Sequence, residues 1–586
     1  MRVLKTMRKA SAAPFLISVI VLCLASFCAA GCSARDNSAQ HTPASLANTL
    51  QDEQILQRMS VEQKVGQLFC VSISGRELND NSASFIKDYN VGNVILFSKN
   101  MGTAPQTAHF CRTLRDAIVS ATGVVPFIGT DQEGGNVVRI TEGATPFPSE
   151  MAIAATGDTH FAEEVGRYTS EELKALGISL NFAPDADVNT NPENPVIGIR
   201  SYGSSPQRVA DYTTAYEQGA EAAREVTTPK HYPGHGDTSV DSHLGLPSDD
   251  ATVDELLQDA LVSFKAAIDA GAPAIMAAHI LYPRIDPTYP ASLSQTLLQD
   301  VLRKKLGFDG MIVTDSLRMG AITEHYGTAE ACVRSIQAGA NLLITGTGGA
   351  HEDDDLSPQK QCIKRVVEAV KSGEISDEVL NAAVLKVLQC KRAYKVDECA
   401  YRPLPDAELA AHAQLARRIS QESITMVKND GGLIPLAVNK SGQSDADQHK
   451  ILALSNNTVA RLDESDTSTE LSFAEYIAKQ TQGDAQHVTG SMSDAEIAQV
   501  AAQAAHYETV VLAVTGDSYI PLARAVIAAN PHTIVVSLGF PYIFNSLNAC
   551  KAFICAYGYT PYAVESVCNV LLGKAETHGS LPVALQ

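Results

Sequence analysis

The sequence predicts a TIM barrel followed by a smaller α/β domain. Short apolar runs recur through the first two thirds of the chain with helical patterns between them, and polar side chains stand where most of these runs end. The length of 586 residues exceeds what one ordinary hydrophobic core covers, so two folded domains are expected. A hydrophobic content of 45% is typical of a globular protein.

Eight apolar runs rich in Val, Ile and Leu are the predicted barrel strands. They lack polar alternation, which indicates burial on both faces, and helical stretches such as TVDELLQDALVSFKAAIDAG between them imply parallel crossovers. Eight such units in about 300 residues fit a TIM barrel. In order, the runs are VGQLFCVSIS from Val65, VGNVILFS from Val91, VVPFIGTDQ from Val124, ISLNFAPDADV from Ile178, EVTTPKHYPG from Glu225, PAIMAAHI from Pro273, GMIVTDS from Gly310 and AGANLLITG from Ala338.

Polar residues stand at the ends of five of these runs. Barrel enzymes place their chemistry at the C-terminal ends of strands and in the loops that follow. Helix capping explains one or two such residues but not the whole set. The residues are Asp131 after the third run, Asp185 and Asp187 after the fourth, Lys230 and His231 after the fifth, His279 after the sixth and Asp315 after the seventh.

A second domain is predicted beyond Cys399, where CAYRPLPDAELAAHAQLARRIS indicates a linker leading into a helix. The strand pattern then restarts with KILALSNN, ETVVLAVTGD, HTIVVSLGFP and AFICAYGYT, which predicts a second parallel sheet. The segment TGDS lacks the spacing of a phosphate loop, so nucleotide binding is not expected. We place the barrel at 51–398, the linker at 399–415 and the second domain at 416–586.

The N-terminus predicts export. Residues 1–31 have basic residues followed by the apolar run PFLISVIVLCLASFCAA, as in a secretory signal peptide. The following AAGC resembles a bacterial lipoprotein cleavage box with Cys32 as the lipidated N-terminus, and an uncleaved membrane anchor is the alternative. Either places the folded part outside the cytoplasmic membrane, on the cell surface or in the periplasm, with 32–50 as a flexible linker.

Charge and cysteine content exclude some functions. A net charge of -21 argues against a nucleic-acid partner, because phosphate binding needs clustered Lys and Arg. Nine cysteines follow Cys32, none in a Cys-x-x-Cys pair, so a zinc knuckle is not expected. Their odd number implies at least one free thiol or an intermolecular bond. Several lie in apolar runs and are predicted core residues. The oligomeric state is not predicted.

The segment KHYPGHGDTSVDSH concentrates groups that bind a metal or transfer a proton. His231, His235, Asp237, Asp241 and His243 are enough ligands for zinc. Proline and glycines disfavour the helix that would bring the first two histidines to one face, which weakens the zinc hypothesis without removing it. Alternatively, Asp241 orients the imidazole of His243, which protonates a leaving group and then deprotonates water. An exposed polar turn also fits these two residues by themselves.

The same segment resembles the signature loop of the NagZ-type β-N-acetylglucosaminidases of glycoside hydrolase family 3. Further motifs resemble the landmarks of that family, in its order: TDQEGG at 130–135, IRSYG at 199–203, MAAHI at 276–280 and VTDSLRM at 313–319. Weaker matches, SITMVKNDGGLIPL and GKAETHGSLPVAL, resemble the αβα sandwich domain of that family. The resemblance covers nearly the whole mature chain.

The resemblance implies a retaining mechanism with Asp315 as nucleophile and His243, oriented by Asp241, as acid/base. Retaining glycosidases place two such groups about 5 Å apart on opposite sides of the anomeric carbon, and an imidazole avoids a second negative charge beside the nucleophile. The implied sugar-binding residues are Asp131, Arg200, Lys230 and His231. Residues that brace the site or contact substrate are Asp185, His235, Asp237 and His279. Because the chain has no Trp, the candidates for sugar stacking are Tyr202 and Tyr232.

The predicted function is that of an exo-acting β-N-acetylhexosaminidase that releases terminal GlcNAc, with peptidoglycan fragments as the expected source. Its expected partners are a β-GlcNAc-terminated glycan or muropeptide and the membrane, through a lipid on Cys32; no cofactor and no metal are expected. Three alternatives remain: a β-N-acetylglucosaminide phosphorylase, a zinc-dependent barrel hydrolase and a surface glycan-binding lipoprotein without turnover. The presence of both predicted catalytic groups disfavours the last.

Overall fold

The computed structural model describes residues 43–242, 244–347, 354–436, 450–457, 459–460 and 471–585. The predicted signal peptide and Cys32 lie outside these residues. The chain divides into a unit that ends at Glu53 and a second unit, Gln54–Gln586. Helix α2 (Pro43–Arg58) begins inside the segment predicted as a flexible linker. Among the described helices, none combines the length and apolar composition that a membrane crossing requires.

Each of the eight predicted runs contains a strand of the barrel. Parallel pairing joins six strands in the order β5-β4-β3-β2-β1-β8 and pairs β6 with β7. The bridge between Val313 and Leu342 connects β7 to β8, and the bridge between Tyr232 and Ala277 connects the segment after β5 to β6. The predicted barrel is therefore confirmed. The strands are β1 (Phe69–Ser72), β2 (Asn93–Ile95), β3 (Phe127–Thr130), β4 (Leu180–Asn181), β5 (Val226–Thr227), β6 (Ala274–Ala277), β7 (Met311–Thr314) and β8 (Leu343–Ile344).

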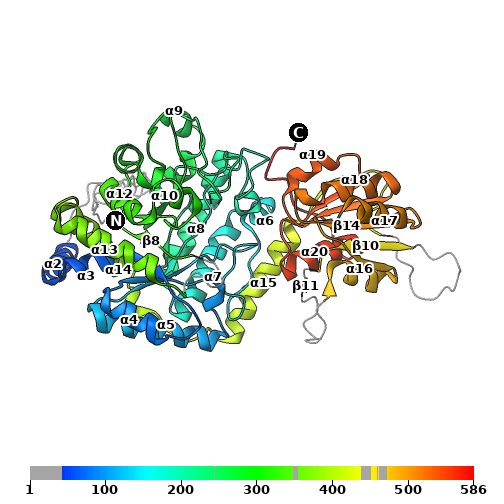
Figure 1. The fold of residues 1–586 in the computed structure, drawn as a ribbon. Helices are drawn as coiled ribbons and strands as arrows, with labels where there is room; N and C mark the ends of the chain where they lie inside the picture. The colour runs from blue at the N-terminus through cyan, green and yellow to red at the C-terminus, as the bar shows by residue number, and fades with distance from the viewer. Residues whose placement is uncertain are drawn as a thin grey trace, which may run out of the picture. The chain divides into compact units, whose positions relative to one another are not determined.

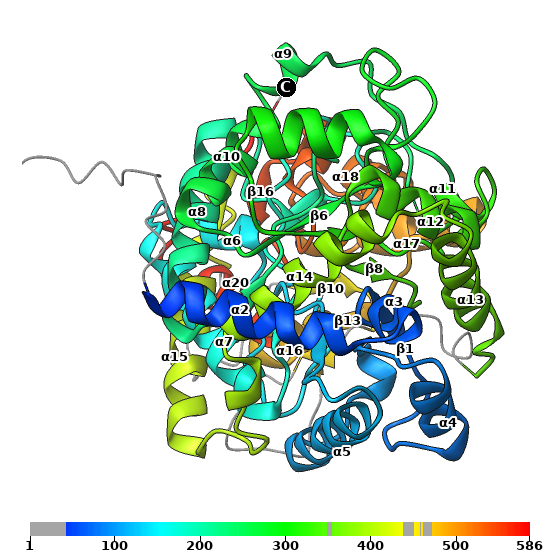
Figure 2. The same cartoon turned by 90° about the vertical axis from the view of Figure 1, so that its left-hand side faces the viewer.

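Helices alternate with these strands and surround them (Figures 1 and 2). The strand side chains are buried throughout, as their unbroken apolar composition predicts. One predicted helix, 252–271, is two, because a turn at 257–260 separates α9 from α10. The helices are α3 (Val61–Gln67), α4 (Asp80–Asp88), α5 (Ala104–Thr122), α6 (Glu150–Ala155), α7 (His160–Leu176), α8 (Pro206–Ala223), α9 (Val253–Leu256), α10 (Leu261–Ala270), α11 (Gly320–Thr323), α12 (Thr328–Ala338), α13 (Ser357–Lys371) and α14 (Asp377–Ala393), with a π-helix η4 (Thr296–Lys305) and the short turns η1 (Ser98–Asn100), η2 (Gly198–Arg200), η3 (Ala291–Leu293) and η5 (Val396–Glu398).

The second domain is built on a six-stranded sheet of order β13-β10-β14-β15-β16-β9. Five strands run parallel, and β9 pairs antiparallel with β16 at one edge. Four of these strands lie in the predicted runs, whereas the edge strands β9 and β13 were not predicted. The strands are β9 (Thr425–Asn429), β10 (Ile451–Ser455), β13 (Asp484–His487), β14 (Thr509–Val514), β15 (Thr533–Ser537) and β16 (Ala552–Cys555), beside a small antiparallel pair, β11 (Val459–Ala460) and β12 (Leu471–Ser472).

Alternate residues of the central strands enter two separate apolar clusters. Leu452 and Leu454 pack with α17 (Asp494–Ala504) and α18 (Ile520–Ala529), and the intervening Ala453 packs with α16 and α20. Helices therefore cover both faces of the sheet, and the predicted αβα sandwich is confirmed (Figure 1). The remaining elements are α15 (Asp406–Ser423), which crosses the predicted boundary at 416, α16 (Phe473–Thr481), η6 (Asp517–Tyr519), η7 (Pro541–Ile543), α19 (Phe544–Leu547) and α20 (Pro561–Leu571).

Candidate active site

A cavity of about 530 Å³ lies where the barrel strands end. Five predicted site residues line it: Asp131 directly after β3, Arg200 in η2, Lys230 and His231 after β5, and Asp315 directly after β7. The barrel thus brings the predicted sugar-binding residues and the predicted nucleophile to one cavity from four separate stretches of the chain. Their common position follows from parallel strands, whose carboxyl ends meet at the same end of the barrel.

The other two predicted catalytic residues lie on the loop after β5. His243 lies outside the described residues. Asp241 is partly buried, and its backbone carbonyl accepts hydrogen bonds from Leu244 N at 2.9 Å and Gly245 N at 3.0 Å. Ser242, between the two predicted partners, is buried and lines the cavity. The loop therefore reaches the cavity wall at the position next to the predicted acid/base.

Glu133 joins two of the cationic groups of the cavity. Arg200 donates from Nε and Nη2 to the two carboxylate oxygens at 2.8 and 2.9 Å. The Nζ atom of Lys230 lies 2.6 Å from Oε1 of Glu133 and donates to Oδ1 of Asp131 at 2.9 Å. Burial raises the pKa of Glu133, but the charges of Arg200 and Lys230 outweigh it and hold that pKa well below its usual range. Glu133 is therefore an ionised, buried carboxylate.

Sequence reasoning missed Glu133, although it lies in the motif TDQEGG after β3. It also missed two further side chains of the cavity wall, Phe97 and Arg139. Phe97 is the penultimate residue of the run VGNVILFS and lies two residues beyond β2, so its place just after a strand was the available signal. Arg139 lies eight residues beyond Asp131, and its Nη2 is 3.5 Å from Oδ2 of that carboxylate. Only the folded loop brings these two residues together.

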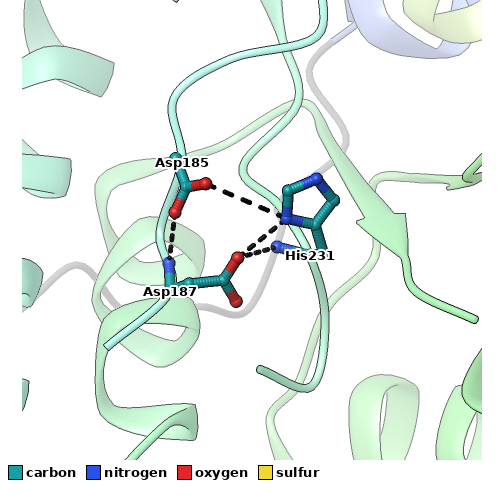
Figure 3. Close-up of side chains that lie close together, drawn as sticks. All are labelled: Asp185, Asp187 and His231. Carbon is teal, nitrogen blue, oxygen red and sulfur yellow. Dashed lines mark hydrogen bonds and ion pairs between the residues drawn. The ribbon is translucent and has the colours of Figure 1, made fainter. Parts of the chain in front are cut away.

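Asp187 fixes the orientation of His231 (Figure 3). The ring Nδ1 lies 2.7 Å from Oδ2 of Asp187, and the backbone N–H of His231 donates to the same oxygen at 3.2 Å. On the other side of the ring, Nε2 is 3.3 Å from Nη2 of Arg200. A guanidinium nitrogen only donates, so Nε2 accepts and the ring proton resides on Nδ1. Asp187 and Arg200 therefore hold the His231 ring in one orientation in the cavity wall.

The same corner tests the zinc hypothesis. Asp185, Asp187 and His231 offer ligand atoms within 4.8 Å of one another (Figure 3). A tetrahedral zinc ion separates its ligand atoms by roughly 3.4 Å, whereas Nδ1 and Oδ2 of the His231–Asp187 pair are at hydrogen-bonding distance, 2.7 Å. Arg200 already places a cation 3.4 Å from Oδ2 of Asp185. These distances favour proton and guanidinium contacts over a metal ion at this position.

Two buried carboxyl groups of this region, Asp185 and Glu150, have a raised pKa. Burial and the neighbouring Asp187 raise the pKa of Asp185 well above its usual range, and burial and Asp185 do the same for Glu150. The backbone N–H of Asp185 donates to Oε1 of Glu150 at 2.9 Å, and that of Asp187 donates to Oδ1 of Asp185 at 3.0 Å. Only Asp187 of the three has a lowered pKa, where the hydrogen bond from His231 outweighs burial.

Two histidines that were predicted to brace the site or contact substrate, His235 and His279, make hydrogen bonds within the protein. His235 is buried, with Nδ1 2.6 Å from the Thr238 hydroxyl and Nε2 3.2 Å from the Ser242 hydroxyl, and burial lowers its pKa to about 4. His279 donates from Nε2 to the carbonyl of Ser316 at 2.9 Å, one residue beyond Asp315. His235 lines the cavity and His279 holds the backbone behind the predicted nucleophile.

The predicted stacking residues are wrong. Tyr202 and Tyr232 are both 0% exposed and belong to the apolar core. The Tyr232 hydroxyl donates to the carbonyl of Leu297 at 2.9 Å, and its ring lies edge-on to Phe264. Tyr232 directly follows His231, and the next side chain along an extended backbone points the other way. Phe97 is the aromatic residue that lines the cavity.

A family model described as the glycosyl hydrolase family 3 N terminal domain matches residues 60–390, the whole barrel. The chain belongs to glycosyl hydrolase family 3. It is 34% identical over 377 residues to Beta-hexosaminidase A of Pseudoalteromonas piscicida, across 61% of this chain and 62% of that protein. The match thus spans less than two thirds of that relative's length.

Solved structures align with both domains of this family 3 chain. A β-N-acetylglucosaminidase from Paenibacillus sp. str. FPU-7 aligns with a TM-score of 0.79 and 33% identity, over 90% of this chain and 99% of that one. A β-glucoside phosphorylase bound to 2FGlc aligns with a TM-score of 0.75 and 25% identity, over 92% and 96%. The two-domain architecture is therefore shared with proteins of different named activities.

Proposed function

We propose that this family 3 protein is an exo-acting retaining β-N-acetylhexosaminidase that releases terminal GlcNAc from glycans. The observation that carries the proposal is the cavity, in which Asp131, Arg200, Lys230 and His231 lie beside Asp315. These groups suit a sugar: the cations and the imidazole are oriented by Glu133 and Asp187, so they act as preorganised hydrogen-bonding groups toward hydroxyl and amide oxygens.

In the proposed mechanism, Asp315 attacks the anomeric carbon while the His243 imidazolium gives its proton to the glycosidic oxygen. The bond between the sugar and the leaving group breaks as the glycosyl–Asp315 ester forms. Neutral His243 then takes a proton from water, whose oxygen attacks the anomeric carbon and regenerates the carboxylate. Asp241 orients the imidazole in both steps. The support for this scheme is the resemblance of the histidine segment and the position of Ser242 on the cavity wall.

The proposed setting is the outer face of the cytoplasmic membrane, where a lipid on Cys32 would anchor the protein near peptidoglycan fragments. Support comes from the sequence of residues 1–32 and from the similarity to proteins named β-hexosaminidase. A terminal GlcNAc on a muropeptide carries the hydroxyl and N-acetyl groups that the cavity residues would bind.

The direct test is release of 4-nitrophenol from 4-nitrophenyl β-GlcNAc by the mature chain. We expect Asp315→Asn to lower kcat by roughly 10³-fold or more, because the amide cannot form the glycosyl ester. Asp116→Asn on the exposed surface of α5 is the control and should retain wild-type turnover. Lack of release by the wild type, or full release by Asp315→Asn, would refute the assignment.

A phosphorylase is the second candidate, favoured by the likeness to the β-glucoside phosphorylase. In that reaction phosphate, not water, attacks the glycosyl–Asp315 ester and yields a sugar 1-phosphate. Product analysis in phosphate buffer distinguishes the two: free GlcNAc alone identifies hydrolysis, and GlcNAc 1-phosphate identifies phosphorolysis.

A further inference from the structure

The loop that carries Arg200 is held from two sides. This loop, residues 189–203, lies between β4 and α8 and contains η2, in which Arg200 stands. We call it the bridge loop. One side of the bridge loop contacts the sandwich domain, and the other contacts the histidine segment after β5.

Three contacts fasten the bridge loop to the sandwich. Ile199, next to Arg200, is only 4% exposed and belongs to one of the two apolar clusters of the sandwich. The Tyr542 hydroxyl donates to the carbonyl of Asn189 at 3.4 Å. Gly203 lies so close to the C-terminal segment that an added Cβ would be 2.4 Å from the carbonyl oxygen of Pro582. The two ends of the loop and the residue before Arg200 therefore all touch the sandwich.

The opposite side of the bridge loop holds the histidine segment. The Asn194 amide donates to the carbonyls of His235 at 2.8 Å and Thr238 at 3.0 Å. The Asn191 amide donates to the carbonyl of Asp237 at 3.3 Å. These bonds hold the backbone of the segment that leads to the predicted acid/base. A displacement of the bridge loop would therefore move two parts of the site.

A second support from the sandwich reaches the floor of the site through α6. The Ser149 hydroxyl, at the start of α6, donates to the carbonyl of Tyr557 at 2.6 Å. At the other end of the helix, Ser580 N donates to the carbonyl of Ala155 at 2.8 Å. This helix carries Glu150, whose carboxyl group accepts a hydrogen bond from the backbone N–H of Asp185. The side chain of Asp185 in turn lies beside Arg200. The bridge loop and α6, which both support Arg200, are thus fixed to the sandwich domain.

We propose that the sandwich domain positions Arg200 and the histidine segment, so that substrate binding in the barrel depends on the second domain. The inference rests on the proposed function, in which Arg200 contacts the terminal sugar. Its physical basis is the paired contact of Arg200 with Glu133, which requires the backbone of η2 in one place. Tyr542 and Gly203 are positioning residues, since they act through the bridge loop.

The test uses the full chain with Tyr542→Ala or Gly203→Ala. We expect each to raise KM for 4-nitrophenyl β-GlcNAc about tenfold with a smaller fall in kcat, because ground-state contacts to the sugar are lost. Amide hydrogen exchange in residues 189–203 should rise about tenfold in the same variants. Tyr542→Phe keeps the ring and loses only a long hydrogen bond, so it should recover most of the wild-type KM.

Two matched variants control for general loss of stability. Ile477→Ala opens a cavity in α16, which packs on the opposite face of the sandwich sheet. Gly157→Ala introduces a side chain at a positive φ of 77°, where nothing lies within 4 Å of the added Cβ. Both should leave KM and the exchange of residues 189–203 within about twofold of the wild type.

The proposal is overturned if Tyr542→Ala and Gly203→Ala leave KM as little changed as these controls do. It is also overturned if amide hydrogen exchange in residues 189–203 rises while KM stays unchanged. If Gly203→Ala fails to fold, Tyr542→Ala decides the result. Failure of the proposed function is distinguishable, because a wild type that releases no GlcNAc refutes the activity while the exchange measurement still reports whether the sandwich orders the bridge loop.

Discussion

At the residue scale, the buried carboxylate of Glu133 holds two cationic side chains of the cavity. Glu133 is ionised although buried, because Arg200 and Lys230 both contact it. Breaking such a buried network by removing one partner is costly, since the remaining charges stay out of water. The orientation of both cations toward the cavity therefore depends on this carboxylate.

Glu133→Gln should weaken substrate binding, because the neutral amide no longer balances the two cations. We expect kcat/KM to fall about 10- to 100-fold, mostly through KM, and the unfolding free energy to fall by about 3 kcal/mol. Steady-state kinetics and urea unfolding measure the two effects. Glu142→Gln, on an exposed position of the same loop, is the control. Equal KM values for both variants would contradict the role given to Glu133.

His235 predicts a pH dependence of stability. Burial lowers its pKa from 6.5 to about 4, so the unfolded chain takes up a proton at a higher pH than the native protein. The contribution of His235 to the free energy of unfolding is therefore fully present above pH 6.5. As the pH falls toward 4, the free energy of unfolding decreases by on the order of 3 kcal/mol.

The measurement is urea unfolding between pH 7 and pH 4, roughly the window that the shifted pKa defines. His235→Asn should flatten the slope in this window, since an amide does not titrate. His109→Asn on the exposed side of α5 should keep the wild-type slope. A slope unchanged in His235→Asn would show that other groups produce the pH dependence.

At the scale of secondary-structure elements, the hydrophobic pattern of the sequence identifies buried strands and misses exposed ones. Strands β3, β10 and β15 are buried along their whole length and were predicted from unbroken apolar runs. The edge strand β13 is DAQH, with three of its four residues exposed, so no such run marks it. The predicted helix 252–271 fails for a related reason, since apolar periodicity continues through the turn between α9 and α10. Whether such a segment forms a strand, a helix or a turn depends on the segments that it contacts, which lie far apart in the sequence.

At the scale of the whole molecule, two segments flank the barrel in the sequence: the N-terminal segment with the proposed lipid on Cys32 precedes it, and the sandwich follows it. Ile199 and α6 of the barrel domain belong to an apolar cluster shared with the sandwich, and α15 connects the domains in sequence. A barrel whose site loops rest on a second domain is expected to function as part of the full chain.

The anchoring prediction concerns the full chain expressed in a bacterial host. We expect the wild type in the membrane fraction with incorporated labelled fatty acid, and Cys32→Ser in the soluble fraction or uncleaved, because only a thiol at the new N-terminus accepts the lipid. Cys70→Ser, within β1, is the control and should remain lipidated. A Cys32→Ser protein that is lipidated like the wild type would rule out the proposed attachment.

By itself, the sequence determined the barrel, the parallel sheet of the second domain and four residues that follow strands and line the cavity, Asp131, Lys230, His231 and Asp315, because local composition encodes burial and strand ends. Tertiary structure decided which of their neighbours join them. Glu133 and Asp187 became partners of predicted residues on other loops, and folding of one loop brought Arg139 to Asp131, whereas Tyr202 and Tyr232 are buried in the core. The physical reason is that local pattern reports how deeply a residue is buried, while the identity of its neighbour depends on segments distant in the chain.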